Sequence, residues 1–359
     1  GIGAAWYMEH NGHVVTGMNN QIVWGTPHVF AVFLIVAASG ALNVASVASV
    51  FGRELYKPLA RLSGLVAVAL LAGGLAVLVL DLGRPDRLIV AMTHYNFKSI
   101  FAWNIFLYTG FFAVVALYLW TMFERRMNGY TARAGVLAFL WRLVLTTGTG
   151  SIFGFLVARE PWHSALLAPL FIVMSFAFGT AAFVLVLMAA CRWSGRPLGD
   201  ELLARLGSLL GIFVAAVLYL VAVHRLTNLY VARQLDFERF LLVDGGVYTA
   251  LFWVGQVLVG GVVPLALVFA VRGRRALAAA AACVIAGGLA QLYVIIIGGQ
   301  AYPQQVFPGK ALSSSAFDGV VAGYAPSLPE VALGLGGVGL ALALTVVGLR
   351  ILPFLPTKV

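Results

Sequence analysis

The first notable feature of this 359-residue sequence is its shortage of charge. Only 10% of the residues are Asp, Glu, Lys or Arg, whereas a soluble domain carries about 25%. So few charges cannot cover the surface of a soluble protein of this size, which excludes a water-soluble globular enzyme. Because 62% of the residues are apolar, the low hydrophobicity of a disordered chain is also missing. The class that remains is an all-α polytopic membrane protein.

Cysteine is almost absent as well. The chain has two Cys, Cys191 and Cys283, which stand far apart inside apolar runs. They cannot build a disulfide framework, a CxxC zinc site or a Cys-ligated iron–sulfur cluster. Of the six His, only His28 and His224 are expected near the ends of membrane helices, which is thin support for a pair of haem ligands. We therefore expect no bound metal and no haem in this chain.

Apolar runs long enough to cross a bilayer recur along the chain. A span needs about 20 residues at a rise of 1.5 Å each, and a chain in lipid must form helices to satisfy its backbone hydrogen bonds. We predict nine transmembrane helices, at about 27–51, 62–82, 101–122, 134–157, 165–191, 206–226, 247–271, 277–298 and 330–351. Residues 1–26 are interpreted as the end of a preceding apolar helix, which would make ten, followed by an outer loop.

The distribution of Lys and Arg predicts the orientation. Most of the 23 basic residues fall in the loops after the first, third, fifth, seventh and ninth predicted helices, and such basic loops face the cytoplasm. The alternate loops, which carry most of the acidic residues, are predicted to lie on the outer, periplasmic side. The net charge of +10 is therefore a topology signal and gives no reason to expect a nucleic acid partner.

A weak internal repeat favours two bundles. The segments Gly40–Arg53 and Gly179–Arg192 have the same length, and each is followed by Ala-Arg-Leu at the start of the next helix. A match this short also arises by chance, but four helices separate the copies, as expected for a parallel repeat. We predict a first four-helix bundle at 27–157, a second at 165–298, an outer loop at 299–329 and a peripheral helix at 330–351. The loop either packs against a partner subunit or is simply exposed.

Polar residues gather at the outer ends of the first two helices. His28 lies just inside the apolar boundary of the first, and Asp81 ends the second, close to Arg84 and Arg87. Because a carboxylate at this depth is costly unless it is paired, we expect Asp81 to pair with Arg84 or Arg87. The cluster is then either an interfacial clamp or a proton-handling group.

A second group of polar residues points into the membrane. Ser39, Asn43 and Ser46 fall near the helical face of His28, and they indicate either close helix packing or a hydrated proton path. In the fourth helix, Arg142 lies on the order of 12 Å from the inner end, where it either snorkels or faces a wet cavity. The same helix continues through Thr149 and Ser151 with thin, polar walls that suit close packing or a flat ligand.

Several short motifs follow one another at defined membrane positions. They are Trp24-Gly25, Asp81-Leu82-Gly83-Arg84-Pro85, Ser99–Trp103, Thr149-Gly150, Ala158-Arg159-Glu160-Pro161-Trp162, Leu166–Phe171, Phe252–Gly255 and Gly261–Pro264. In this order and at these positions, the motifs resemble the NrfD family, the membrane subunits of polysulfide-reductase-like respiratory complexes. The ten-helix members look more similar than the eight-helix ones.

The resemblance implies a quinone-reactive subunit of a prokaryotic inner-membrane oxidoreductase, with no redox metal of its own. A quinone, menaquinone or ubiquinone, would bind at the outer face of the first bundle, against an extracytoplasmic ferredoxin-like iron–sulfur subunit. A molybdopterin-type or other catalytic subunit, or a cytochrome c, would lie beyond that subunit, and membrane lipid would surround the helices.

On this hypothesis the outer cluster does the chemistry. His28 bonds a quinone oxygen and exchanges its proton, while Asp81, held by Arg84, relays protons to outer water. The other expected site residues are Trp103, Thr149, Ser151, Glu160 and Trp162 around the quinone, and Ser39, Asn43, Ser46 and Arg142 along a proton path. The chain departs from relatives in two places. It has no Tyr or His near Thr146–Thr149, and Asn104 stands where Gly is common. A passive anchor and a secondary transporter stay open as alternatives.

Overall fold

The computed structural model describes residues 1–304 and 319–355. Every regular element in those ranges is a helix. Nine helices of the described chain are long and apolar enough to cross a membrane: Thr26–Ser49, Glu54–Leu80, Ile100–Phe123, Arg125–Gly154, Leu167–Trp193, Asp200–Tyr230, Val247–Val271, Arg274–Ala301 and Leu328–Ile351. Each coincides with one predicted segment, so the all-helical fold and the nine spans are confirmed.

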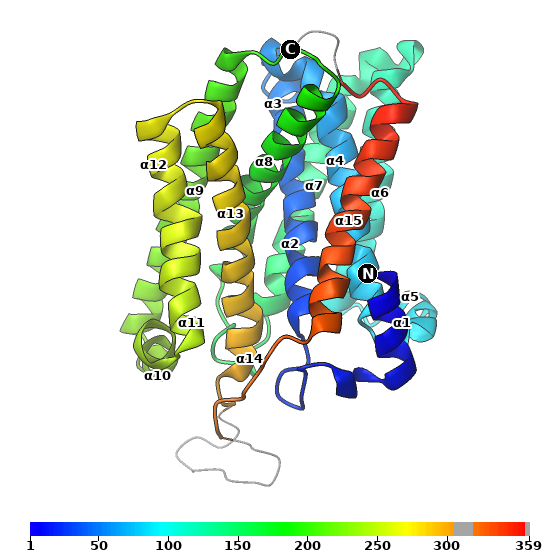
Figure 1. Cartoon of the computed structure of the whole chain (residues 1–359). Coiled ribbons are helices and arrows are strands. Elements are labelled where there is room, and N and C mark those ends of the chain that lie inside the picture. The colour runs from blue at the N-terminus through cyan, green and yellow to red at the C-terminus, as the bar shows by residue number, and fades with distance from the viewer. Residues whose placement is uncertain (305–318, 356–359) are drawn as a thin grey trace.

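The first four spans pack against one another (Figure 1). α2 packs along α4, α6 packs along α7, and contacts of α7 with α2 and of α6 with α4 close the group. The first span has a break at Leu42, where α2 ends and a shorter helix, α3, begins. The bounds of these helices are Thr26–Ala41 for α2, Asn43–Ser49 for α3, Ala60–Leu80 for α4, Ile100–Phe123 for α6 and Thr131–Gly154 for α7.

The next four spans form a second group in which α8 contacts α9 and α13, and α13 contacts the seventh span. Much of the seventh span is wound as a π-helix, η7, and α13 continues into a second π-helix, η9. The bounds are Leu167–Trp193 for α8, Asp200–Tyr230 for α9, Val247–Ala250 for α11, Leu251–Val262 for η7, Val263–Ala266 for α12, Leu267–Val271 for η8, Arg274–Tyr293 for α13, Val294–Gly298 for η9 and Gly299–Ala301 for α14.

The ninth span, α15 (Leu328–Ile351), packs on the outside of α4 and α2, and α1 (Ile2–Asn11) packs on α15. The remaining described elements are short connections: η1 (His13–Val15), η2 (Glu54–Leu59), η3 (Pro85–Arg87), α5 (Leu88–Thr93), η4 (Arg125–Tyr130), η5 (Ala232–Gln234), α10 (Leu235–Arg239) and η6 (Phe240–Asp244).

Two glycines form the seam between the groups. Gly40 of α2 faces Gly179 of α8, and a Cβ atom added to either would overlap the backbone of the other helix. Small residues of this kind let membrane helices approach closely. Just beyond the seam, the Asn43 amide donates to the Thr180 hydroxyl at 2.8 Å and to the Phe176 carbonyl at 3.0 Å. The residues that suggested a repeat therefore meet at the centre of the molecule.

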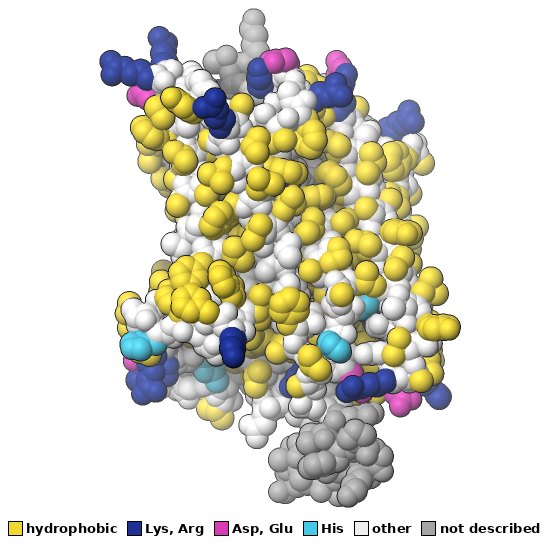
Figure 2. All heavy atoms as spheres, turned by 180° about the vertical axis from the view of Figure 1, so that it is seen from behind, with side chains coloured by type: hydrophobic (Ala, Val, Ile, Leu, Met, Phe, Trp, Pro, Cys, Tyr) yellow, Lys and Arg dark blue, Asp and Glu magenta, His cyan; other side chains and the backbone are white. Residues whose placement is uncertain are grey.

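The surface divides into an apolar band and two charged ends. Figure 2 shows the band on one face, with His side chains gathered near one end, called the histidine end below. The described part of the loop at this end, 319–327, lies against the chain itself, since the Ala322 amide donates to the Ala301 carbonyl at 2.9 Å. Residues 305–318 of the predicted outer loop lie outside the described residues.

Candidate functional site

The start of α2, which carries His28, is fixed by side chains from distant parts of the chain. Pro27 stands in the first turn of α2, a position that suits its fixed φ. The Tyr324 hydroxyl accepts from the Thr26 amide at 2.6 Å and donates to Glu330 at 2.6 Å. Burial and the Glu330 hydrogen bond raise the pKa of the Tyr324 hydroxyl, so it stays protonated and keeps donating.

The segment before α2 is held by Gln300 of α14. Its side-chain oxygen accepts from the backbone amides of Val23 and Trp24, both at 3.0 Å, and its Nε2 donates to the Trp24 carbonyl at 2.9 Å. Arg159 reinforces this contact, since its guanidinium donates to the Gln300 carbonyl at 3.1 Å and to the Gln21 carbonyl at 2.9 Å. Burial lowers the pKa of Arg159. The second group of helices therefore positions Trp24.

His28 and Asp81 form a partly buried pair. His28 Nδ1 lies 2.7 Å from Asp81 Oδ2, and the Asp81 side chain is 1% exposed. The expected pairing of Asp81 with Arg84 or Arg87 is therefore wrong. Arg84 instead bonds Asp86 through two contacts of 3.0 Å in a solvent-exposed pair, and this hydrogen bond lowers the pKa of the Asp86 carboxyl.

Two glycines explain why Asp81 pairs with His28 and not with Arg84. Gly74 lets α4 approach α2, because a Cβ there would lie 2.9 Å from the Ala31 carbonyl oxygen. The beginning of α2 thus lies beside the end of α4, where Asp81 is the C-terminal capping residue. Gly83 then adopts φ 66°, a left-handed conformation that favours glycine, and turns the chain so that Arg84 points away from Asp81.

An apolar pocket opens beside His28. It has a volume of about 370 Å³ and lies among α2, α4, α5, α6 and α7. Its lining is largely aliphatic and aromatic, with residues such as Val32, Leu75, Met92 and Ile152. Pockets of this size and character hold small organic ligands.

Four polar side chains join His28 in the pocket wall: Asn104, Tyr108 and Thr109 of α6 and Thr149 of α7. Asn104 of α6 donates to the Gly148 carbonyl at 3.2 Å, and its buried Oδ1 has no hydrogen-bond partner. Thr149 of α7 lines the wall, and its hydroxyl donates to the Leu145 carbonyl at 3.0 Å. Tyr108 was missed in the sequence although it stands one helical turn after Asn104. It supplies beside Thr149 the phenol that the fourth span lacks.

Aromatic rings back the pocket. Trp24 stacks on His28 with centroids 5.8 Å apart and on Trp162 with centroids 5.4 Å apart. Phe153 meets Trp24 and Trp162 edge-on. Trp162 therefore lies behind Trp24 in the stack and outside the pocket wall, while its Nε1 donates to the Ile295 carbonyl at 2.6 Å.

Four other predicted residues also lie outside the pocket lining. Trp103 is 48% exposed, and its Nε1 donates to the Phe97 carbonyl at 2.9 Å. Ser151 is buried in α7. Glu160 pairs with Arg233 at 2.9 Å, and Arg84 belongs to the exposed pair described above. For these residues the structure gives contacts other than those expected around a ligand.

The expected inner path is a compact network at the seam. Arg142 is buried, and its Nη1 lies 2.5 Å from Asn43 Oδ1 and 3.3 Å from the Ser39 carbonyl. The Ser39 hydroxyl donates to the Arg142 carbonyl at 3.1 Å, while Ser46 donates to its own helix at Leu42. The guanidinium also lies over the rings of Phe139 and Phe176. Arg142 therefore points inward and does not reach the membrane surface.

Within residues 1–304 and 319–355, no three His, Cys, Asp or Glu side chains lie close enough together to hold a metal ion. The two His at helix ends are separately engaged. His28 bonds Asp81 at 2.7 Å in the first group, and His224 bonds Arg225 at 2.8 Å in the second.

A bundle of apolar spans with an apolar pocket between its helices and a His–Asp pair at the head of that pocket defines a class: multi-pass helical membrane proteins with a polar site inside the bundle. Comparison with known proteins narrows the class. Residues 14–304 match the family model described as polysulphide reductase, NrfD. The match spans most of the chain, so this chain belongs to the NrfD family of membrane proteins.

Curated relatives cover nearly the whole chain. The Hdr-like menaquinol oxidoreductase integral membrane subunit of Archaeoglobus fulgidus is 28% identical over 99% of this chain and 90% of its own length. A putative dimethyl sulfoxide reductase membrane subunit from Halobacterium salinarum is 30% identical, with 98% and 88% covered. A component of the polysulfide reductase of Wolinella succinogenes is 23% identical, with 79% and 96% covered. These relatives are named as parts of oxidoreductases.

Proposed function

We propose that this chain is the quinone-reactive membrane subunit of a respiratory oxidoreductase complex. The observation that carries the proposal is the His28–Asp81 pair, 2.7 Å apart, at the head of the apolar pocket. A quinone requires an apolar slot for its tail and hydrogen-bond partners for its ring oxygens. The relatives named as membrane subunits of menaquinol oxidoreductase and of dimethyl sulfoxide reductase support the same class.

The pocket residues fit such a ligand. His28, Asn104, Tyr108, Thr109 and Thr149 contribute polar atoms to a wall that is largely apolar. The unpartnered Oδ1 of Asn104 is a buried acceptor, and a buried polar atom without a partner costs free energy. Asn104 would therefore accept a hydrogen bond from a hydroxylated ring. When bound, a quinone supplies the reversible uptake of electrons and protons at its ring oxygens.

The protein moves the proton. Because the Asp81 carboxylate is an acceptor, it draws the His28 proton to Nδ1, which leaves the Nε2 lone pair available. His28 Nε2 accepts a proton from the ligand hydroxyl, and the resulting imidazolium is stabilised by Asp81, as in other His–Asp pairs. Asp81 then relays the proton to water at the histidine end. Arg84 does not hold Asp81 in this scheme.

The seam network is the proposed second proton path. Ser39, Asn43 and Arg142 are joined by hydrogen bonds, and the Thr146 hydroxyl donates to the Arg142 carbonyl at 2.8 Å, one turn before Thr149. Ser46 completes the expected path toward the end of the molecule opposite the histidine end. Replacing Arg142 with Leu should lower proton uptake by vesicles that contain the complex. Normal uptake would show that protons do not follow this path.

The proposed partner is an extracytoplasmic ferredoxin-like iron–sulfur subunit at the histidine end, with a catalytic subunit beyond it. Exposed apolar side chains flank the pocket at this end, including Ile89 and Val90 of α5, Phe97 and Trp103. A partner seated there would place its cluster close to His28, so that electrons need not cross the membrane.

Gentle purification from the native membrane tests the proposal. We expect an iron–sulfur subunit and stoichiometric quinone to accompany the chain, and quinol-linked electron transfer by the purified complex. Iron–sulfur partners without quinone and without quinol-linked turnover would indicate a passive anchor. A chain that purifies alone and transports a solute would be a secondary transporter, and the proposal would be wrong.

A further inference from the structure

The second group of helices contains a buried ionic cluster that the quinone site does not use. Glu238 of α10 is completely buried, and its Oε1 accepts from Arg225 and from Asn228 of α9, both at 2.7 Å. Its other oxygen, Oε2, is buried and has no hydrogen-bond partner. A buried charge with an unsatisfied oxygen is costly, and a proton on Oε2 would remove this cost.

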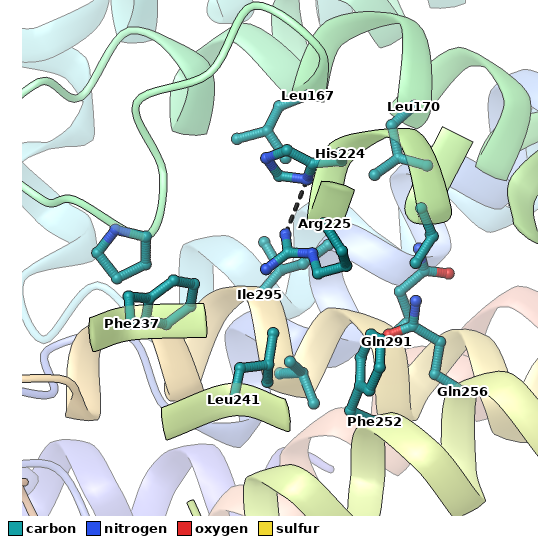
Figure 3. Close-up of a pocket in the computed structure, with 13 residues that line it drawn as sticks. Leu167, Leu170, His224, Arg225, Phe237, Leu241, Phe252, Gln256, Gln291 and Ile295 are labelled. Carbon is teal, nitrogen blue, oxygen red and sulfur yellow. Dashed lines mark hydrogen bonds between the residues drawn. The ribbon is translucent and has the colours of Figure 1, made fainter. Parts of the chain in front are cut away.

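His224 extends the cluster toward a small cavity (Figure 3). Its Nδ1 lies 2.8 Å from the guanidinium of Arg225. Since a guanidinium can only donate, Nδ1 accepts, and the ring proton lies on Nε2. This Nε2, like Nε2 of Gln291, is buried and has no partner.

The cavity is large enough for water. His224, Gln256 and Gln291 line it, together with apolar side chains such as Phe252 and Leu241, and its volume is about 30 Å³. A buried water needs roughly 10–15 Å³ of such volume and two to four polar partners. The unpartnered donors of His224 and Gln291 supply part of that set, with the Gln256 amide beside them. The lining therefore suits one or two water molecules.

We propose that this cluster is a proton-binding site of the second group, with Glu238 Oε2 as the proton acceptor and the cavity at His224 holding its water. The proton comes from water at the histidine end and binds Oε2, which becomes a hydroxyl, and no electron moves. The cluster then gains one positive charge, because Arg225 keeps its own.

Access is short. Arg239, the next residue after the fully buried Glu238, has a side chain that is 76% exposed, so water lies one residue along the chain from Glu238. Burial raises the pKa of the Glu238 carboxyl, against the opposing charge of Arg225. The titratable and charged groups around the cluster are Arg225 and His224 on α9, Asp236 and Arg239 on α10, Tyr302 after α14, and the Arg233–Glu160 pair.

The π-helix η9 connects this site to the quinone pocket. Its residues Val294 and Ile295 line the small cavity, while Ile296 lines the large pocket. Such π-helical turns occur often at functional sites. Trp162, which stacks on Trp24, donates to the Ile295 carbonyl at 2.6 Å. The small cavity therefore lies behind the same wall that backs His28.

Infrared difference spectroscopy of the purified protein during a pH titration tests the site without any quinone turnover. We expect a protonated-carboxyl C=O band that appears as the pH falls, shifts in D₂O and disappears in Glu238→Gln. The matched control is Glu160→Gln, which removes another buried, Arg-paired Glu with an unpartnered Oε2 and should leave this band in place.

A second variant keeps the proposal testable if Glu238→Gln does not fold. Asn228→Leu keeps Glu238 but removes the hydrogen bond at 2.7 Å that favours the charged carboxylate, so the band should titrate at higher pH than in the wild type. Loss of the band in Glu160→Gln together with its retention in Glu238→Gln would overturn the proposal, and so would an Asn228→Leu titration identical to that of the wild type.

Discussion

The two groups of helices each place a histidine near the histidine end, and the two side chains have hydrogen-bond partners of opposite charge. His28 Nδ1 faces a carboxylate, 2.7 Å away, and His224 Nδ1 faces a guanidinium, 2.8 Å away. The carboxylate fixes the proton on Nδ1 of His28 and leaves Nε2 as a base. The guanidinium fixes the proton on Nε2 of His224 and makes that atom a donor. The residue type alone does not define the role, because the neighbour selects the tautomer.

The cavities beside the two histidines also differ in volume. About 370 Å³ of largely apolar pocket lies at His28, and about 30 Å³ lies at His224. Only the first accommodates a ligand with an apolar tail. The second is suited to water and a proton. Variants of both sites test this contrast between a proposed ligand site and a proposed proton site.

The largest expected effect comes from removing the base. His28→Ala should lower quinol-linked turnover by about 10²–10⁴-fold, the usual contribution of a general base, while the complex still assembles. Steady-state quinol oxidation by the purified complex measures it. His94→Ala is the matched control, because His94 is exposed and its ring contacts the adjacent Thr93 hydroxyl. Equal turnover in both variants would remove His28 from the mechanism.

The next effect concerns the partner of the base. Asp81→Asn keeps the shape of the side chain but removes the charge that stabilises the imidazolium, so we expect turnover to fall by roughly tenfold or more. The same assay measures it, with Asp86→Asn as the control for the exposed Arg84 pair. If Asp86→Asn had the larger effect, the pairing observed here would not be the functional one.

A packing variant tests whether the two groups need their close approach. Gly40→Val places a branched side chain against the backbone of α8 at Gly179, and overpacking of this kind costs about 1–3 kcal/mol. Thermal unfolding in detergent should show a lower midpoint. Gly339→Val is the control, because nothing lies within 4 Å of a Cβ at Gly339. Equal midpoints would mean that the seam contributes no stability.

A smaller effect is expected from the phenol in the pocket. Tyr108→Phe removes a hydroxyl from the pocket wall, and a hydrogen bond from that hydroxyl to the ligand would contribute about 0.5–1.5 kcal/mol. We expect the KM for quinol to rise severalfold, with kcat changed less. Tyr219→Phe is the control, because Tyr219 is 68% exposed on α9. An unchanged KM would show that the Tyr108 hydroxyl does not contribute to quinol binding.

The smallest effect is a pH dependence of stability in the second group. Burial raises the pKa of Glu238 in the folded protein, so the folded state binds the proton more readily than the unfolded state. The stability that Glu238 contributes is therefore present below the unfolded pKa and lost as the pH rises through the folded pKa. Between these two pKa values, the midpoint of thermal unfolding should fall less steeply with rising pH in Glu238→Gln than in the wild type. Identical slopes would show that Glu238 binds no extra proton on folding.

Much of the fold could be predicted because lipid imposes a strong pattern. The nine apolar runs and their polar breaks predict the nine spans of the described chain directly. His28 and Asp81 could also be chosen, since polar groups at that depth are rare. Their pairing could not, because it depends on the approach of α2 to α4 at Gly74 and on the left-handed turn at Gly83.

The rest of the site comes from long-range contacts. Gln300 holds Trp24 from 276 residues away, and Tyr324 holds Thr26 from 298 residues away. No local pattern predicts such contacts. Tyr108 was missed for a different reason. Its helix is apolar or aromatic on every face, so periodicity does not separate the residues that face lipid from those that face the pocket.

The most direct test of the proposed quinone site is covalent labelling of the purified complex with a photoreactive quinone, followed by peptide mapping. We predict labels on pocket residues of α2 and α6, within 28–35 and 101–109, that excess unlabelled quinone prevents. We also predict labelling around His28 in preference to His224. Competable labels confined to the second group, or none on this protein, would contradict a quinone site at the His28–Asp81 pair.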